Sequence, residues 1–228
     1  MKKRPVKAHA ARGVNGAAPA VKGEGADARE KILDVAERLF ARDGVAETTV
    51  RNITGEAGVN VAAVNYYFRS KEELYREVID RRRGPLNEER LRLLEGCLAR
   101  AGGRRPAVRE VLRALAEPSL RLCFQHPHFA RLSSRLRFDP DADLWSHFRS
   151  AQTELIKKFE AAFAAALPEL TEDELRARLH YVLGAVQQVW AHCPLPASET
   201  PEGLIGSFMT FYEAGLRAPA PQPFKSDS

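Results

Sequence analysis

Hydrophobic side chains recur three, four and seven residues apart along most of this 228-residue chain. That spacing places them on one face of an α-helix and indicates a series of amphipathic helices. Glycine, proline and capping residues divide the pattern, and no alternating strand pattern follows residue 27. The sequence therefore predicts an all-α fold of about nine helices. They are expected at about 28–42, 50–57, 61–68, 71–101, 106–125, 128–137, 142–167, 172–192 and 201–217.

The stretch from Thr48 to Lys71 contains two short helical patterns joined by a tight turn. Gly58 suits the positive φ that is common just after a helix, and Asn60 is a favourable N-cap for the next one. Two short helices joined in this way are typical of a helix-turn-helix, whose second helix enters a DNA major groove. The expected buried faces consist of Val50, Ile53 and Ala57 in the first helix and Val61, Val64 and Phe68 in the second.

The outward stripe of the second helix has side chains suited to reading DNA. It begins with small residues, which allow close approach, and Asn65 carries an amide that can pair with adenine. Tyr66 adds a ring and a hydroxyl group, and Arg51 of the first helix also points outward. On spacing alone, a surface helix of an ordinary bundle and a DNA-reading helix remain equally open. The stripe consists of Ala62, Asn65, Tyr66 and Arg69.

Four segments, ILDVAERLFARDG, TTVRNIT, AGVN and YFRSKEELY, occur in order between Ile32 and Tyr75. In sequence and spacing they resemble the DNA-binding domain of the tetracycline-repressor (TetR) family of bacterial transcription regulators. Residues 61–65 read VAAVN where members often carry Lys-Gly-Thr-Leu-Tyr, and the run VNVAAVNYYF resembles a subgroup. By this resemblance, Lys71 and the helix N-terminus beside it meet a phosphate. The expected DNA-contacting residues are Thr49, Arg51, Asn60, Val61, Ala62, Asn65, Tyr66, Tyr67 and Lys71.

Breaks in the pattern suggest how the chain is divided. Ser70 with Glu73 has the spacing of a capping box at the start of the 71–101 helix. Gly84-Pro85 is expected to kink that helix, which joins the DNA-binding part to the rest. The expected parts are a disordered basic tail at 1–27, a DNA-binding domain at 28–75, an effector-binding and dimerisation domain at 76–217, and a frayed tail at 218–228.

The long apolar faces after residue 106 need partners, either inside the chain or in a second copy. The resemblance implies that the last two long helices pair with their copies into a four-helix bundle, giving a homodimer. It also implies an effector pocket for a small hydrophobic molecule beside the linker helix. The candidate pocket residues are Phe124, Phe129, Trp145, Phe148 and Gln187.

Composition and charge limit the classes of function that this chain can have, but they indicate no further binding site. The net charge is +5, but residues 28–80 hold eight basic and ten acidic residues, whereas residues 1–27 carry a net charge of +4. Any DNA affinity must therefore come from placed cations and the tail. No apolar run approaches the length of a membrane span. Three widely spaced cysteines argue against a disulfide framework and favour the cytoplasm.

No metal-binding or catalytic motif stands out, so neither a cofactor nor an enzymatic activity is expected. The sequence predicts a homodimeric, ligand-responsive transcriptional regulator. Such a protein would be a repressor released from a palindromic operator on double-stranded DNA by a small molecule. One alternative is an architectural DNA-binding protein that ignores ligands. A less favoured one is an enzyme or carrier built on a helical bundle.

Overall fold

The computed structural model describes residues 22–136 and 142–219, and within those ranges the chain folds into nine α-helices without a strand. No helix in the described part is long and apolar enough to cross a membrane. The helices are α1 (Lys22–Asp43), α2 (Val50–Ala57), α3 (Val61–Phe68), α4 (Lys71–Ala101), α5 (Val108–Gln125), α6 (Pro127–Leu136), α7 (Ala142–Ala166), α8 (Glu172–Ala191) and α9 (Pro201–Arg217). The predicted fold class is confirmed.

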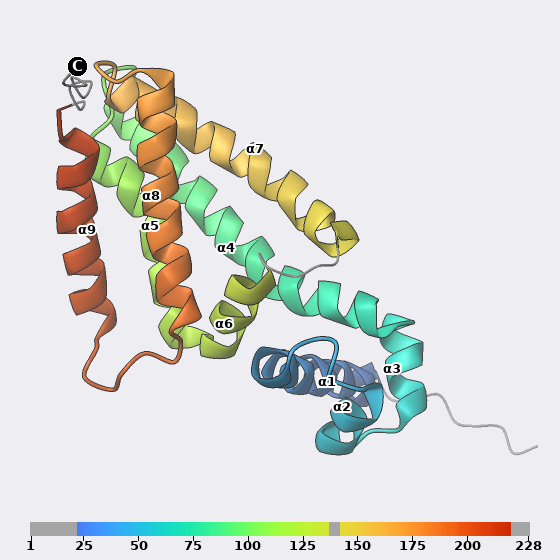
Figure 1. Cartoon of the computed structure of the whole chain (residues 1–228). Coiled ribbons are helices and arrows are strands. Elements are labelled where there is room, and N and C mark those ends of the chain that lie inside the picture. Colours follow the sequence, from blue (N-terminus) through green and yellow to red (C-terminus); the bar gives the residue numbers. More distant parts are fainter. Residues whose placement is uncertain (1–21, 137–141, 220–228) are drawn as a thin grey trace, which may run out of the picture.

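The helices are arranged as a small head and a larger body (Figure 1). The head consists of α1, α2 and α3 with the first turns of α4, at the lower right of the view. From there α4 runs diagonally into the body, where it packs beside α5 and α7. The helices α8 and α9 stand side by side at the far left. The helix α6 contacts α1 as well as α8, so the head is held by α6 and α4 together.

The head is built around large side chains that each of its helices contributes. Phe40 of α1 meets Tyr75 of α4 edge to face, with ring centroids 5.3 Å apart. Ile53 of α2 and Val64 of α3 are fully buried in the same core. Burying side chains of this size stabilises the fold by about 1.5–3 kcal/mol each. The small head therefore has enough core to fix the angle between α2 and α3.

Local signals define the two short helices as the sequence predicts. Thr49 caps α2 and forms a capping box with Asn52, whose side chain accepts from the Thr49 backbone. Gly58 ends the helix at φ 66°, a left-handed conformation that glycine adopts without strain. Asn60 then caps α3, where its Oδ1 accepts a hydrogen bond from the Ala62 N–H at 3.0 Å.

One predicted boundary is wrong. The first helix begins at Lys22, six residues before the predicted start, so the end of the expected tail is helical. The linker helix α4 has the predicted bounds, and its 31 residues include Gly84 and Pro85 without a break. A proline removes one backbone hydrogen bond, and the long buried face of α4 on α5 outweighs that loss. Residues 1–21 and 220–228, the rest of the two predicted tails, lie outside the described residues.

Only one of the two hydrogen bonds of the predicted capping box forms at the start of α4. Ser70 Oγ accepts from the Glu73 N–H at 3.1 Å, as expected. The Glu73 carboxylate accepts from Arg76 at 2.6 Å instead of turning back to the cap. An ion pair one turn along the helix thus takes the place of the reciprocal bond.

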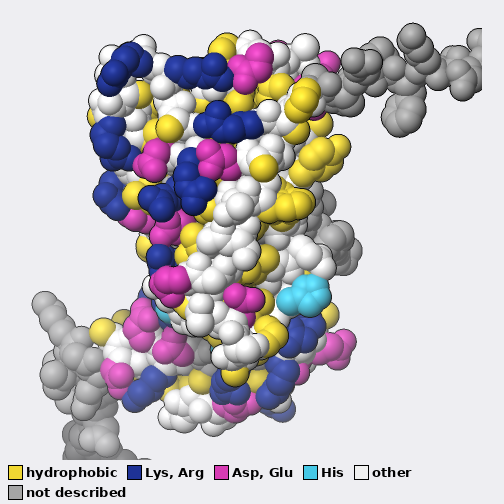
Figure 2. Space-filling model, turned by 90° about the vertical axis from the view of Figure 1, so that its left-hand side faces the viewer, with side chains coloured by type: hydrophobic (Ala, Val, Ile, Leu, Met, Phe, Trp, Pro, Cys, Tyr) yellow, Lys and Arg dark blue, Asp and Glu magenta, His cyan; other side chains and the backbone are white. Residues whose placement is uncertain are grey.

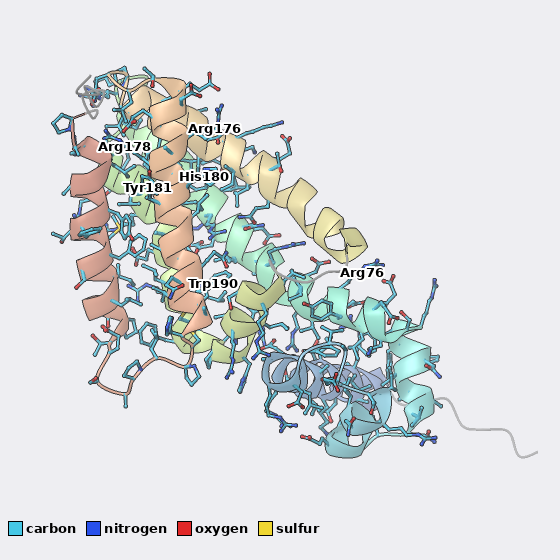
Figure 3. The ribbon with its side chains drawn as sticks, viewed as in Figure 1. Arg76, Arg176, Arg178, His180, Tyr181 and Trp190 are labelled. Carbon is cyan, nitrogen blue, oxygen red and sulfur yellow. The ribbon has the colours of Figure 1, made fainter. Side chains whose placement is uncertain are left out.

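In the body, Arg178 joins α8 to the end of α9. Its side chain is 7% exposed, and Nη1 donates to the carbonyl oxygens of Leu216 at 2.8 Å and Ala218 at 2.6 Å. Figure 3 shows Arg178 at the upper end of α8, beside the last turn of α9. The last carbonyl groups of a helix have no partner within the helix, and a cation is favourable there. Arg178 therefore holds α8 and α9 side by side.

Candidate DNA-reading surface and effector cavity

The second helix of the pair, α3, presents an open face to solvent. Val64 and Phe68 are buried, whereas Ala62 and Asn65 are exposed and Tyr66 is 81% exposed. The ring of Tyr66 and the amide of Asn65 are therefore both available for contact with another molecule. The predicted outward stripe of α3 is therefore exposed to solvent, as expected from the sequence.

One assignment on the inner face is wrong. Val61 is 42% exposed, so it does not share the buried face of Val64 and Phe68. It is the first residue of α3. Its exposure agrees with its place among the candidate DNA-contacting residues. Arg51, on α2, is also exposed.

Four other candidate residues already have structural roles. Thr49 and Asn60 are N-caps, so one oxygen of each side chain is bonded to its own helix. Tyr67 is half-buried, and its ring meets that of Tyr66 edge to face. Lys71 donates from Nζ to the backbone oxygen of Val45 at 2.9 Å. No local sequence pattern signals this contact, since it joins positions 26 residues apart.

Arg69 has an unusual backbone at the end of the reading helix. Its φ is 63° and ψ is −44°, and Ser70 N–H donates to the Phe68 oxygen across it at 2.6 Å. This is a γ-turn with positive φ at its middle residue, a rare and strained form. Strained residues concentrate at functional sites, where the surroundings hold them in place. Nothing in the local sequence signals this turn.

A cluster of ion pairs joins α4 to α1. Arg81 donates to Asp34 and Glu37, both at 2.8 Å, and to Glu30 at 3.0 Å. Arg82 donates to Glu37 at 3.2 Å. Glu37 is only 6% exposed, so its charge depends on these two arginines. The cluster sets how α1, and with it the head, sits against the linker helix.

Beside this cluster, a cavity of about 450 Å³ opens between α4 and α5. Both arginines of the cluster line it, together with His126 at the corner between α5 and α6. Burial, followed by the nearby Arg82 charge, lowers the pKa of His126. The cavity is large enough for a small organic ligand. Its apolar lining consists of Pro85, Leu86, Leu93, Pro118 and Leu122.

The structure does not bring the five predicted pocket residues together. Phe129 is 1% exposed and packs against Trp190, so it belongs to the core. Phe124 is half-buried and lines neither cavity. Gln187 lines a second cavity of about 280 Å³ at α6 and α8, where its Oε1 is buried without a partner in the described part of the chain. The side chains of Trp145 and Phe148 lie outside the described residues.

The outer faces of α8 and α9 form an exposed surface that is rich in small and apolar side chains. Tyr181 on α8 is 69% exposed and Phe211 on α9 is 70% exposed. Gly184 and Ala214, at helical spacing from these rings, allow another helix to approach closely. Figure 3 shows Tyr181 partway along α8. Figure 2, which views the molecule from the α9 side, shows hydrophobic side chains gathered over part of this face, with Lys and Arg mainly towards its upper left.

Comparisons with known proteins agree with this arrangement. Residues 32–78 match the model of the tetR family of bacterial regulatory proteins, and residues 113–215 match the tetracyclin repressor-like C-terminal domain. The HTH-type transcriptional repressor BepR of Brucella suis is 37% identical over 67 residues, 29% of this chain and 32% of that protein. The dual regulator CecR of Shigella flexneri is 31% identical over 138 residues, 57% of this chain and 59% of that protein.

The chain spans only about a quarter to a third of the length of several curated relatives that it matches. The likeness to solved structures is broader. A TetR-like regulator from Rhodococcus sp. RHA1 aligns with a TM-score of 0.61 at 21% identity, over 83% of this chain and 95% of that one. Mycobacterium smegmatis AmtR aligns with a TM-score of 0.62 at 22% identity, over 85% and 87%. The two family models together span more than half of the chain, which therefore belongs to the TetR family.

Proposed function

We propose that this protein is a ligand-responsive transcriptional regulator that binds a palindromic operator as a homodimer. The open face of α3 carries the proposal, because it combines an amide, an exposed ring and small side chains on a helix of fixed position. Repressors among the matched relatives, such as BepR, support a repressing role. The VAAVN version of α3 places its own side chains at the base edges, so the operator differs from those of members with Lys-Gly-Thr-Leu-Tyr.

Base reading is tested by replacing Asn65 with alanine. A bidentate amide–adenine contact contributes about 1–3 kcal/mol of discrimination. The variant should therefore lose roughly fivefold or more in affinity for an operator selected from random duplexes, and lose its preference at one base pair. Affinity for a random duplex should stay the same. Equal affinity and equal selectivity in variant and wild type would show that Asn65 reads no base.

The homodimer is proposed to form through the outer faces of α8 and α9. One reading helix buries little surface, whereas two helices about 34 Å apart can read both halves of a palindrome. Exposed Tyr181 and Phe211, with small residues around them, give the flat apolar surface that such a helix-to-helix contact needs. In a closed dimer this contact would join the same faces of both copies about a two-fold axis.

Charge placed on this surface should separate the two copies. Tyr181→Arg with Phe211→Arg is expected to give a folded monomer in sedimentation equilibrium, because two cations would face their own copies across the axis. Tyr66→Arg, which replaces another exposed ring, on α3, is the matched control and should remain a dimer. A double variant that sediments like wild type would place the interface elsewhere.

Ligand control is proposed to act through the junction of α1, α4 and α5. The cavity between α4 and α5 shares Arg81 and Arg82 with the ion pairs that hold α1. A ligand that alters these contacts changes the position of α3 relative to the body. By linkage, operator DNA then weakens ligand binding by the same factor as ligand weakens operator binding.

A further inference from the structure

The charge in the cavity between α4 and α5 indicates what kind of ligand it accepts. Its lining contains four guanidinium groups against two carboxylates, those of Arg81, Arg82, Arg113, Arg121, Glu89 and Glu117. Glu117 forms ion pairs with both Arg113, at 3.2 Å, and Arg121, at 2.8 Å. Glu89 is held by Arg92, which lies outside the lining. Each of the four guanidinium groups is paired with a carboxylate, and Asp34, Glu37, Glu110 and Glu202 among these carboxylates lie outside the lining. The acid group of a ligand would therefore take the place of one of these carboxylates, beside the apolar part of the lining.

A fifth arginine is buried on α4, one residue along the chain from the cavity lining. Arg90 follows the lining residue Glu89 on α4 and is 4% exposed. It donates to neutral acceptors, namely the Leu115 oxygen at 3.1 Å, Asn87 Oδ1 at 3.2 Å and Ser119 Oγ. Burial lowers its pKa to about 10, which leaves it charged at neutral pH. A buried cation bonded to neutral groups adds positive potential that these groups do not cancel.

One donor at the head end of the cavity has no acceptor. Arg81 Nε is buried without a hydrogen-bond partner among the described residues, although Nη1 and Nη2 of the same side chain bind α1. Buried donors are paired in the great majority of cases, so an orphan beside a cavity calls for an explanation. An oxygen of a bound acid group would satisfy it.

We propose that this cavity binds an amphipathic organic carboxylate. Its acid group is held by Arg81, Arg82 and the arginines of α5, and its apolar body packs on Leu86, Leu93 and Pro118. This refines the effector of the proposed function, and the regulatory part of the inference rests on that function. The carboxylate competes with Asp34 and Glu37 for the same two guanidinium groups, which loosens α1 from α4. The sequence alone predicts a hydrophobic effector, whereas this lining selects one that also carries a negative charge.

The test uses three amphiphiles with the same ten-carbon chain and different head groups: decanoate, decanol and decyltrimethylammonium. Each is titrated into the full chain by calorimetry, below its aggregation concentration. Decanoate should bind at least about tenfold more tightly than decanol, since one charge-assisted hydrogen bond contributes roughly that factor. The ammonium should bind most weakly. Equal affinities, or tighter binding of decanol or the ammonium, would overturn the proposal.

Two variants and a control locate the site. Arg113→Gln and Arg121→Gln should each lower decanoate affinity about tenfold and leave decanol unchanged. The control is Arg109→Gln on the same helix, because Arg109 is similarly exposed and paired with a glutamate but lies outside the lining. Thermal melts confirm that all three fold. If the three variants bind decanoate alike, the carboxylate site is not this cavity.

Operator binding is measured on the same samples with and without decanoate. Decanoate should weaken the affinity of the wild type for its selected operator, and it should weaken that of Arg113→Gln much less. Failure to bind any operator without amphiphile would overturn the proposed function and leave the calorimetric result standing. Operator binding that decanoate leaves unchanged, despite occupying the cavity, would overturn the competition between the ligand and α1.

Discussion

Lys71, the first residue of α4, donates a hydrogen bond from Nζ to the backbone oxygen of Val45, 2.9 Å away. Val45 lies in the loop between α1 and α2, so the bond joins the linker helix to the loop that positions α2. An ammonium group has three donors, and one of them is taken by this contact. Lys71 therefore supports the head as well as offering charge at a helix N-terminus.

This contact predicts that Lys71→Met loses both stability and DNA affinity. A charged donor contributes about 1.5–3 kcal/mol when buried and less when half-exposed, so we expect a loss of about 1 kcal/mol in the free energy of unfolding. Affinity should fall by the same factor for the operator and for random duplexes, because phosphate contacts carry no base information. Lys31→Met, which changes an exposed residue of α1, is the control. A loss confined to the operator would contradict the prediction.

The strained turn at Arg69 allows charge and backbone strain to be separated. Arg69→Gly should raise the free energy of unfolding by about 1 kcal/mol, because glycine adopts positive φ without strain. Arg69→Ala should not, since it keeps a side chain at that φ. Both variants should weaken DNA binding equally if the guanidinium at the end of α3 contacts a phosphate. Chemical denaturation and duplex titration of the two variants provide the measurement; equal stabilities would exclude the strain.

A third prediction concerns the uninterrupted linker helix. Gly84 and Pro85 are both exposed, and a Cβ on Gly84 would meet no atom within 4 Å. Gly84→Ala should therefore stabilise the protein by about 0.5–1 kcal/mol, and Pro85→Ala should add to this by restoring the backbone bond to Arg81.

The double variant should also change how strongly a ligand alters operator affinity, because a stiffer α4 transmits less bending between cavity and head. The coupling free energy between ligand binding and operator binding is typically about 1–3 kcal/mol in allosteric proteins. Thermal melts test the stability, and operator titrations with and without decanoate test the coupling. A destabilised double variant would mean that the helix needs the glycine or proline for a bend.

Individual residues show which structural features can be predicted from the sequence and which cannot. Gly58, Asn60 and Thr49 define α2 and α3 through local bonds, so their positions were predictable from residue type and spacing. The contact from Lys71 to Val45 and the ion pairs of Arg81 link segments that are distant in sequence, and no local pattern contains them. Aromatic content alone pointed to Phe129 as a pocket residue, but burial against Trp190 depends on how α6 meets α8.

The continuous α4 has a related cause. Proline and glycine lower local helix propensity, which is what the sequence displays. Whether a helix breaks depends on packing along its whole length, and α4 has buried side chains on both sides of Pro85. Tertiary contacts therefore decide the outcome at a position where propensity predicts an interruption.

The lowered pKa of His126 predicts a dependence of stability on pH. Burial and Arg82 lower this pKa in the folded chain, with a further lowering from Arg81 that Glu37 and Asp34 partly offset. As the pH falls below about 6.5, the unfolded chain binds the proton first, so the free energy of unfolding falls until the folded pKa is passed. His126→Gln should flatten this part of the curve, and His128→Gln, an exposed neighbour, should not. Denaturation curves between pH 5 and 8 that fall equally in both variants would contradict the assignment.

The most direct test of the account is whether two α3 helices read a palindrome at fixed spacing. An operator selected from random duplexes should contain two half-sites whose centres lie about one helical turn, or a multiple of it, apart. Inserting five base pairs between them turns one half-site to the opposite side of the duplex. We expect the affinity for this duplex to fall to that for a random duplex. A duplex with ten inserted base pairs and a duplex with a single half-site should also be bound weakly. Operator binding that the five-base-pair insertion leaves unchanged would contradict the paired-helix reading of this structure.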